Sequence, residues 1–165
     1  MLVIADTSPL HYLVLIDHSD VLPILFERVL IPPAVTEGLR RPRTPVPVRA
    51  WVVSPPAWLE VHVPRQPLIT PTLPLGAGER EALSLAQDLR ADLLLMDDLE
   101  GGKEAEHHGL AVMGTLRVLE LAAECGLLDF PPAITTLQTT SFHLPLSLVR
   151  DMLARDTARK SQPQN

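Results

Sequence analysis

Acidic side chains directly follow two apolar segments of this chain. Asp6 comes after Val3-Ile4-Ala5, and the pair Asp97-Asp98 comes after Leu93-Leu94-Leu95-Met96. Short apolar runs of this kind predict buried strands. In an open parallel sheet the carboxyl ends of the strands line one crevice, where ligands bind. The sequence therefore predicts that these carboxylates meet at one edge of a sheet and form a metal site.

Further acidic residues occur where other strands end or helices begin. Glu37 lies close to the end of a predicted strand at 28–31, and Glu79 and Glu81 lie in the first turns of a predicted helix. Mg²⁺ and Mn²⁺ prefer oxygen ligands. Acids gathered in a partly dry cleft repel one another unless a cation lies between them. A bound ion polarises a phosphate oxygen and lowers the pKa of its water, which is the chemistry of phosphodiester hydrolysis.

Helix capping is the ordinary explanation for any one of these acids, because Asp and Glu favour the positive end of a helix dipole. Capping explains Asp6 and Asp97 less well, because each directly follows an apolar strand whose burial requires no charged residue. Three hydroxyl groups are candidates for substrate binding. Thr7 and Ser8 can hold Asp6 or a water molecule, and Thr115 can approach a phosphate, although capping explains all three at least as well.

Strand and helix patterns alternate along the chain, which predicts an α/β fold with a mostly parallel sheet. Prolines exclude a long helix from the stretch at about 40–75, where we expect a loop, a short turn at 48–51 and an edge strand within 58–63. Residues 100–102 are expected to form a polar turn. The other expected strands are 2–5, 28–31, 93–96 and 110–113, and the expected helices are one opened by Ser8-Pro9 and those at 20–26, 33–39, 79–90, 103–108, 116–124, 131–138 and 145–155.

The length predicts one domain over residues 1–155, with a proline-rich insertion at about 40–75 and a disordered tail at 156–165. No apolar run is long enough to cross a bilayer, and the N-terminus does not resemble a signal peptide. The single cysteine excludes an internal disulfide and fits the reducing cytoplasm, which is the expected location. The net charge of −6 argues against a broad nucleic-acid surface without excluding a nuclease.

One basic cluster stands out in this acidic chain, and all of its members lie in the proline-rich stretch. A solvated loop explains the cluster as well as a rim that contacts phosphates does. Its members are Arg40, Arg41, Arg43, Arg49 and Arg65.

Five segments, in order, resemble PIN-domain proteins, and the group related to VapC-type toxin ribonucleases most closely. They are Val3–Leu10, Pro33–Glu37, Leu75–Leu83, Leu94–Asp98 and Val112–Leu116. The resemblance implies a three-layer α/β/α sandwich with a mostly parallel sheet, and a Mg²⁺- or Mn²⁺-dependent endoribonuclease for single-stranded RNA. It also implies a homodimer neutralised by a small antitoxin protein.

The resemblance assigns the first two family acids to Asp6 and Glu37. The third is Glu79 or Glu81, of which Glu79 is preferred, and the fourth is Asp97 or Asp98. Met96 stands where the family often has a hydroxyl residue. A catalytically degenerate module that binds RNA or a protein partner is the alternative. A phosphoryl-transfer enzyme with Asp6 as nucleophile is less favoured, because no second Asp follows two residues later.

Overall fold

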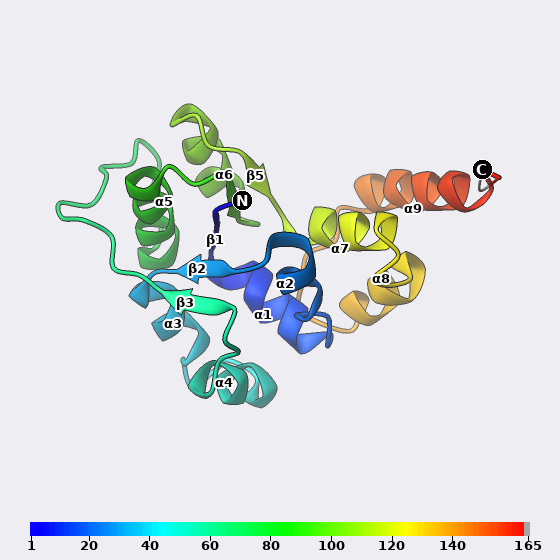
Figure 1. Cartoon of the computed structure of the whole chain (residues 1–165), viewed down its shortest axis with the longest axis horizontal. Helices are drawn as coiled ribbons and strands as arrows, with labels where there is room; N and C mark the ends of the chain where they lie inside the picture. The colour runs from blue at the N-terminus through cyan, green and yellow to red at the C-terminus, as the bar shows by residue number, and fades with distance from the viewer. Residues whose placement is uncertain (164–165) are drawn as a thin grey trace. The chain divides into compact units, whose positions relative to one another are not determined.

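The computed structural model describes residues 1–163. A parallel five-stranded sheet organises the first part of the chain. Its strands lie in the order β3-β2-β1-β4-β5, and every neighbouring pair is parallel (Figure 1). The α/β class and the parallel sheet expected from the sequence are thus confirmed. The strands are β1 (Val3–Ala5), β2 (Val29–Ile31), β3 (Leu59–Val61), β4 (Leu93–Leu95) and β5 (Val112–Met113).

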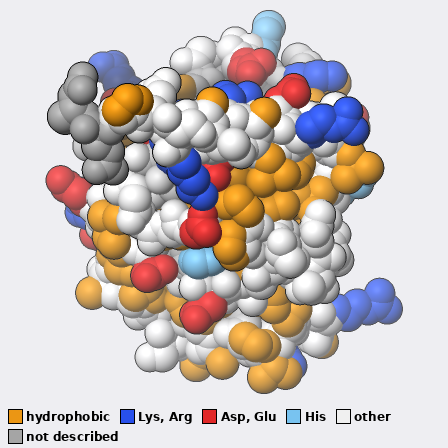
Figure 2. All heavy atoms as spheres, turned by 90° about the vertical axis from the view of Figure 1, so that its right-hand side faces the viewer, with side chains coloured by type: hydrophobic (Ala, Val, Ile, Leu, Met, Phe, Trp, Pro, Cys, Tyr) orange, Lys and Arg blue, Asp and Glu red, His pale blue; other side chains and the backbone are white. Residues whose placement is uncertain are grey.

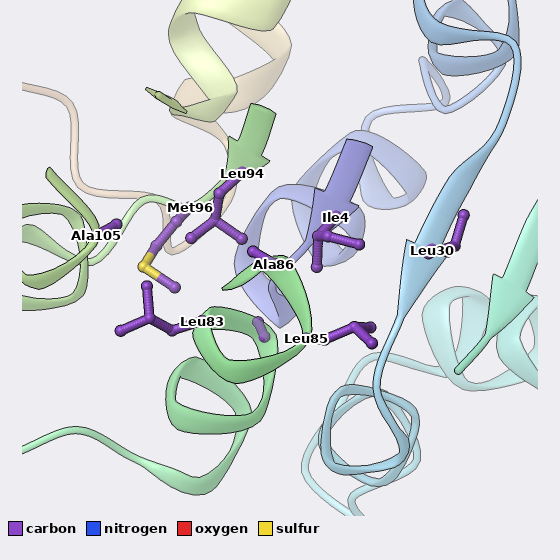
Figure 3. Close-up of a cluster of buried hydrophobic side chains, with 9 residues drawn as sticks. Ile4, Leu30, Leu83, Leu85, Ala86, Leu94, Met96 and Ala105 are labelled. Carbon is purple, nitrogen blue, oxygen red and sulfur yellow. The ribbon is translucent and has the colours of Figure 1, made fainter. Parts of the chain in front are cut away.

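The central strands β1, β2 and β4 are buried along their whole length. Side chains alternate between the two faces of a strand, so a strand that is buried throughout is covered on both faces. Ile4 and Leu94 point to the face covered by helix α5 (Ala77–Leu89), where they join Leu83, Ala86 and other apolar residues in one cluster (Figure 3). This core fixes the ends of β1 and β4 beside the start of α5.

Together with α5, five further helices surround this sheet in the chain segment 1–115. Of these six helices, four begin close to where the sequence predicts. The five further helices are α1 (Thr7–Leu15), α2 (Val21–Phe26), α3 (Pro33–Leu39), α4 (Val46–Val53) and α6 (Leu99–His107). Where a turn was expected, α4 forms two helical turns, because Pro45 and Pro47 occupy its N-terminal positions, which tolerate proline.

The start of α6 corrects the polar turn expected at 100–102. The side chain of Asp98 accepts a hydrogen bond from the Gly101 backbone N–H and so caps the helix. Gly101 leaves room for the Met96 sulfur, which a Cβ at this position would displace. Two glycines that would ordinarily argue for a turn therefore lie inside a helix.

The described residues form two compact units, of which the first is Met1–Thr115 and the second begins at Leu116. A compact unit is not by itself a separate domain, so one domain over 1–155 stays a prediction. Helix α7 (Thr115–Glu124) starts at the last residue of the first unit, and α8 (Phe130–Gln138) and α9 (Leu146–Lys160) follow. Within residues 1–163, every helix is too short or too polar to span a lipid bilayer.

Helix α9 continues five residues beyond the expected end at 155, which corrects part of the predicted disordered tail. Asp156 lies one turn before the end of α9 and pairs with both Arg159 and Lys160. These cations also favour the negative end of the helix dipole. Residues 164–165 of the predicted tail lie outside the described residues.

Candidate metal centre

The ends of β1 and β4 form the point where the strand order of the sheet reverses. From β1 the chain proceeds to β2 on one side, whereas β4 pairs with β1 on the other side. Ligand crevices form at such a switch point, outside the carboxyl ends of the strands. Asp6 follows β1, and its backbone N–H donates to the Leu95 carbonyl at the end of β4, 2.9 Å away. The structure thus places Asp6 at the switch point of the sheet, at the strand end where the sequence predicts it.

The carboxyl of Asp6 is buried, with 2% of the residue exposed, and its Oδ1 has no hydrogen-bond partner among the described residues. Burial raises the pKa of this carboxyl from 3.8 to about 7. A hydrogen bond from the Thr7 backbone N–H opposes the rise, while the charges of Glu79, Asp97 and Asp98 add to it. A buried carboxylate with one unpartnered oxygen and three other acids near it is the electrostatic arrangement that a cation relieves.

Asp97 is the most highly hydrogen-bonded of the candidate acids. Its Oδ2 accepts hydrogen bonds from the hydroxyls of Ser8 and Thr115, each at 2.7 Å. Its Oδ1 accepts the Thr115 backbone N–H, also at 2.7 Å. Asp97 therefore ties the start of α1 to Thr115, within the first unit. Gly114 leaves room for this contact, since a Cβ there would lie 2.9 Å from Asp97 Oδ1.

These bonds correct the capping roles expected for the hydroxyl residues. Helix α1 begins at Thr7, two residues before the expected first helical residue Pro9, with Asp6 at its N-cap and no capping hydrogen bond from a side chain. Ser8 and Thr115 use their hydroxyls to hold Asp97 instead. The sequence gives no sign of these pairings, because Ser8 and Asp97 meet only when β1 and β4 pair.

Two other candidate acids stabilise helix N-termini. Asp98 caps α6, as described above, and Glu81 accepts the Ala34 backbone N–H in the first turn of α3 at 2.8 Å. Glu79 accepts no hydrogen bond from any residue in 1–163 and lies over Gly76 at the start of α5. Because Glu79 contributes to the electrostatic field at Asp6 and its carboxylate is not otherwise engaged, it suits the third acidic position better than Glu81.

Glycines bring three helices close together around Thr7. A Cβ at Gly78 of α5 would lie 3.2 Å from both Asp6 Oδ1 and Thr7 Oγ1, and a Cβ at Gly38 of α3 would lie 3.0 Å from the same hydroxyl. Both spacings are tighter than ordinary contacts, so these positions favour glycine. Thr7 therefore lies between α3 and α5, beside Asp6. Neither glycine was singled out from the sequence as part of the site.

Glu37 lies on α3, and its side chain is exposed. Across residues 1–163, no three His, Cys, Asp or Glu side chains are arranged so that they could hold a metal ion. The unpartnered Oδ1 of Asp6 fits a cation ligand, whereas Asp97, Asp98 and Glu81 bind hydrogen-bond donors. A cation at Asp6 would require Glu79 or Asp97 to turn toward it.

Comparisons with known proteins identify the family and the fold. A family model of the PIN domain matches residues 2–157, which span both compact units. The chain is similar to the solved structure of a PilT N-terminus domain protein from the hyperthermophilic archaeon Sulfolobus solfataricus P2. The two are 16% identical with a TM-score of 0.52, over 75% of this chain and 95% of that one. This similarity shows the fold alone. No curated protein matches the chain.

Proposed function

Because the chain belongs to the PIN-domain family, we propose that it is a metal-dependent endoribonuclease that hydrolyses phosphodiester bonds of single-stranded RNA. PIN domains are generally nucleases that use divalent metal ions. The observation that carries the proposal is the buried Asp6 carboxyl at the switch point, with one unpartnered oxygen and with acidic neighbours that raise its pKa.

Asp6, Glu79 and Asp97 are the residues that would hold Mg²⁺ or Mn²⁺, and Asp98 and Glu37 are further candidates. When bound, such a cation polarises a phosphate oxygen and lowers the pKa of a water molecule. The proposal needs no nucleophile from the protein itself.

The remaining groups position the acids. Ser8 and Thr115 donate hydrogen bonds to Asp97 and hold its carboxylate at the end of β4. The Thr7 backbone N–H donates to Asp6 and favours the ionised form that a cation needs. Gly78 leaves open the space beside Asp6 Oδ1 that a Cβ would occupy, 3.2 Å from that oxygen. Because the hydroxyls of Ser8 and Thr115 donate to Asp97, Thr7 is the hydroxyl residue that we propose to donate to a phosphate oxygen.

An RNA cleavage assay tests this function. Purified protein is incubated with end-labelled single-stranded RNA in Mg²⁺, in Mn²⁺ or in EDTA. We expect cleavage only with metal, and a fall to background for Asp6→Asn. Asp151→Asn is the matched control, because Asp151 is exposed on α9 and the chemical change is the same. Absence of cleavage by wild-type protein under every metal condition contradicts the proposed activity.

A degenerate PIN-like module that binds RNA or a protein without cutting it is the second candidate. The hydrogen bonds that engage Asp97, Asp98 and Glu81 favour it, as does the lack of three ligands in place among residues 1–163. Calorimetric titration with Mn²⁺ separates the two. A nuclease binds Mn²⁺ through Asp6, whereas a degenerate module shows no binding that depends on a carboxylate.

The family likeness also supports proposals about biological context. A role as the toxin of a toxin–antitoxin pair, neutralised by a small antitoxin protein, is compatible with a PIN domain. A homodimer and a cytoplasmic location are proposed on the same basis. Size-exclusion chromatography with light scattering tests the dimer, and co-expression with the product of an adjacent gene tests the antitoxin.

A further inference from the structure

We propose that the loop between α3 and α4 is a docking surface for the backbone of a single-stranded nucleic acid. The loop presents Arg40, Arg41 and Arg43, which we call the arginine loop. The inference deepens the proposed function and rests on it for the choice of partner. The observations that carry it are the charge, the exposure and the hydrogen bonds of the loop residues.

The charge of the segment is opposite to that of the whole protein. Residues 38–59 contain four arginines and no Asp or Glu, whereas the chain carries a net charge of −6. A local excess of cationic side chains on an acidic protein attracts polyanions to one place instead of to the whole surface. On the face drawn in Figure 2, some Lys and Arg side chains lie beside Asp and Glu side chains and others stand apart from them.

The three guanidinium groups are exposed and unpaired. Arg40, Arg41 and Arg43 form no ion pair and no side-chain hydrogen bond with any residue in 1–163. Elsewhere in the same range, arginines such as Arg117 and Arg155 pair with buried Glu120. Guanidinium groups without a protein partner keep all their donors for an external anion, and their fork geometry suits phosphate.

The backbone of the loop is held in one shape. Thr44 is 8% exposed, its N–H donates to the Arg41 carbonyl at 3.0 Å, and its hydroxyl donates to the Gly38 carbonyl at 3.2 Å. Arg49 Nε donates to the Thr44 carbonyl at 2.9 Å. Pro42 and Pro45 further restrict the chain. A preformed loop loses little backbone entropy on binding, so its arginines can contribute more of their interaction energy.

The loop lies next to the candidate metal centre. It begins two residues after Gly38, which packs against Thr7, and Thr44 brings the end of the loop back to the Gly38 carbonyl. Thr7 directly follows Asp6. Figure 1 shows α3 and α4 next to each other, with this connection between them. A strand bound along the arginine loop can therefore extend toward Asp6.

A binding experiment with matched charge changes tests this proposal. The arginine-loop variant Arg40→Gln/Arg41→Gln/Arg43→Gln is compared with Arg90→Gln/Lys103→Gln/Arg150→Gln, which removes three exposed and unpaired charges elsewhere. The probes are fluorescent oligouridylate and oligothymidylate of about 15 nucleotides. Full-length protein is used in EDTA, fluorescence anisotropy is measured over a range of NaCl concentrations, and thermal melting confirms that both variants fold.

The proposal predicts that the arginine-loop variant raises Kd at least tenfold. It also predicts a salt slope that is smaller by about 2, since each lost contact with a single strand accounts for about 0.7. The control should change Kd less than threefold. Similar effects of the two variants, or no binding by wild type, overturn the proposal. Polyglutamate and RNA are also compared as competitors at the same concentration of charge. If polyglutamate competes as strongly as RNA, the proposal is overturned, because the partner is then an acidic peptide.

The two proposals fail separately. If the protein binds oligonucleotides through the arginine loop but never cleaves RNA, the nuclease activity is contradicted and the docking surface stands. If wild type cleaves RNA and the arginine-loop variant binds as wild type does, the docking surface is contradicted and the nuclease stands. Equal effects on RNA and DNA probes identify the shared phosphodiester backbone as the group recognised.

Discussion

The carboxylate of Asp97 accepts both the backbone N–H and the hydroxyl of Thr115, each at 2.7 Å. Thr115 is fully buried and is the first residue of α7. One acid at the end of β4 therefore holds Thr115 and, through the Ser8 hydroxyl, the start of α1. A carboxylate that looks like a metal ligand in the sequence has a structural role as well.

Thr115→Val tests that structural role. The substitution keeps the shape of the side chain but removes the hydroxyl bonded to Asp97, so we expect the free energy of unfolding to fall by about 1–3 kcal/mol. Thr157→Val is the control, because Thr157 is exposed on α9 and should change stability by less than about 0.5 kcal/mol. Urea unfolding measures both. Equal small effects would show that the Thr115 hydroxyl contributes little.

The raised pKa of Asp6 predicts a pH dependence for the metal-free protein. Between an unfolded pKa of 3.8 and a folded pKa of about 7, the folded state keeps a proton that the unfolded state has lost. The contribution of Asp6 to stability therefore falls as the pH rises from about 4 to 7, by on the order of 4 kcal/mol. Thermal melting in EDTA over this range measures it.

Asp6→Asn should remove that dependence. We expect the variant to melt at a higher temperature than wild type at pH 8 in EDTA, because no buried charge remains, and to melt at a similar temperature near pH 4. Asp151→Asn serves again as the exposed control and should follow the wild-type profile. A wild-type profile that rises from pH 4 to 7, with no difference in Asp6→Asn, contradicts this account of the Asp6 environment.

Glu79 and Glu81 should respond in opposite ways to the same substitution. Glu81→Gln weakens the hydrogen bond to the Ala34 N–H and should lower the free energy of unfolding by about 1 kcal/mol. Glu79→Gln removes a charge near Asp6 and should leave stability unchanged or higher, while weakening Mn²⁺ binding. Chemical unfolding and calorimetry measure the two effects. Loss of Mn²⁺ affinity in Glu81→Gln alone would reverse the assignment.

Glu104 provides a pH-dependent contact outside the site. It is 1% exposed and accepts hydrogen bonds from Thr72, whose hydroxyl lowers the pKa of the Glu104 carboxyl below 4.5. Its contribution to stability is therefore complete above pH 4.5 and is lost as the pH falls through the lower, folded pKa. Glu104→Gln should lower the melting temperature at pH 7, and the difference from wild type should become small in acid.

Glu106→Gln is the control for that prediction, since Glu106 is exposed on the same helix. Melting curves between pH 3 and 7 provide the comparison. A Glu104→Gln variant that is as stable as wild type at pH 7 would show that the bonds to Thr72 add nothing.

The sheet could be predicted because strand signals in a buried parallel sheet are local. Three strands are apolar throughout and are followed within two residues by Asp or Pro. They are Val3–Ala5, Val29–Ile31 and Leu93–Leu95. The position of Asp6 at a strand end follows from the same pattern, together with the rule for ligand crevices. The place of Asp6 at the end of β1 was therefore predictable, whereas its role as a metal ligand stays a prediction.

The partners of the other acids could not be predicted, because they depend on contacts between distant segments. Glu81 meets Ala34 only after α5 packs on α3, and Ser8 meets Asp97 only after β1 pairs with β4. The helix over Gly101 and Gly102 likewise depends on packing against Met96. Helix propensity alone predicts a turn there.

A crystal soaked in Mn²⁺, examined by anomalous scattering, tests the central claim most directly. The account predicts one strong peak within about 2.5 Å of Asp6 Oδ1, with Glu79 or Asp97 as a second ligand, and no peak in crystals of Asp6→Asn. A peak remote from Asp6, or none at saturating Mn²⁺, would contradict the claim that these acids form a metal centre.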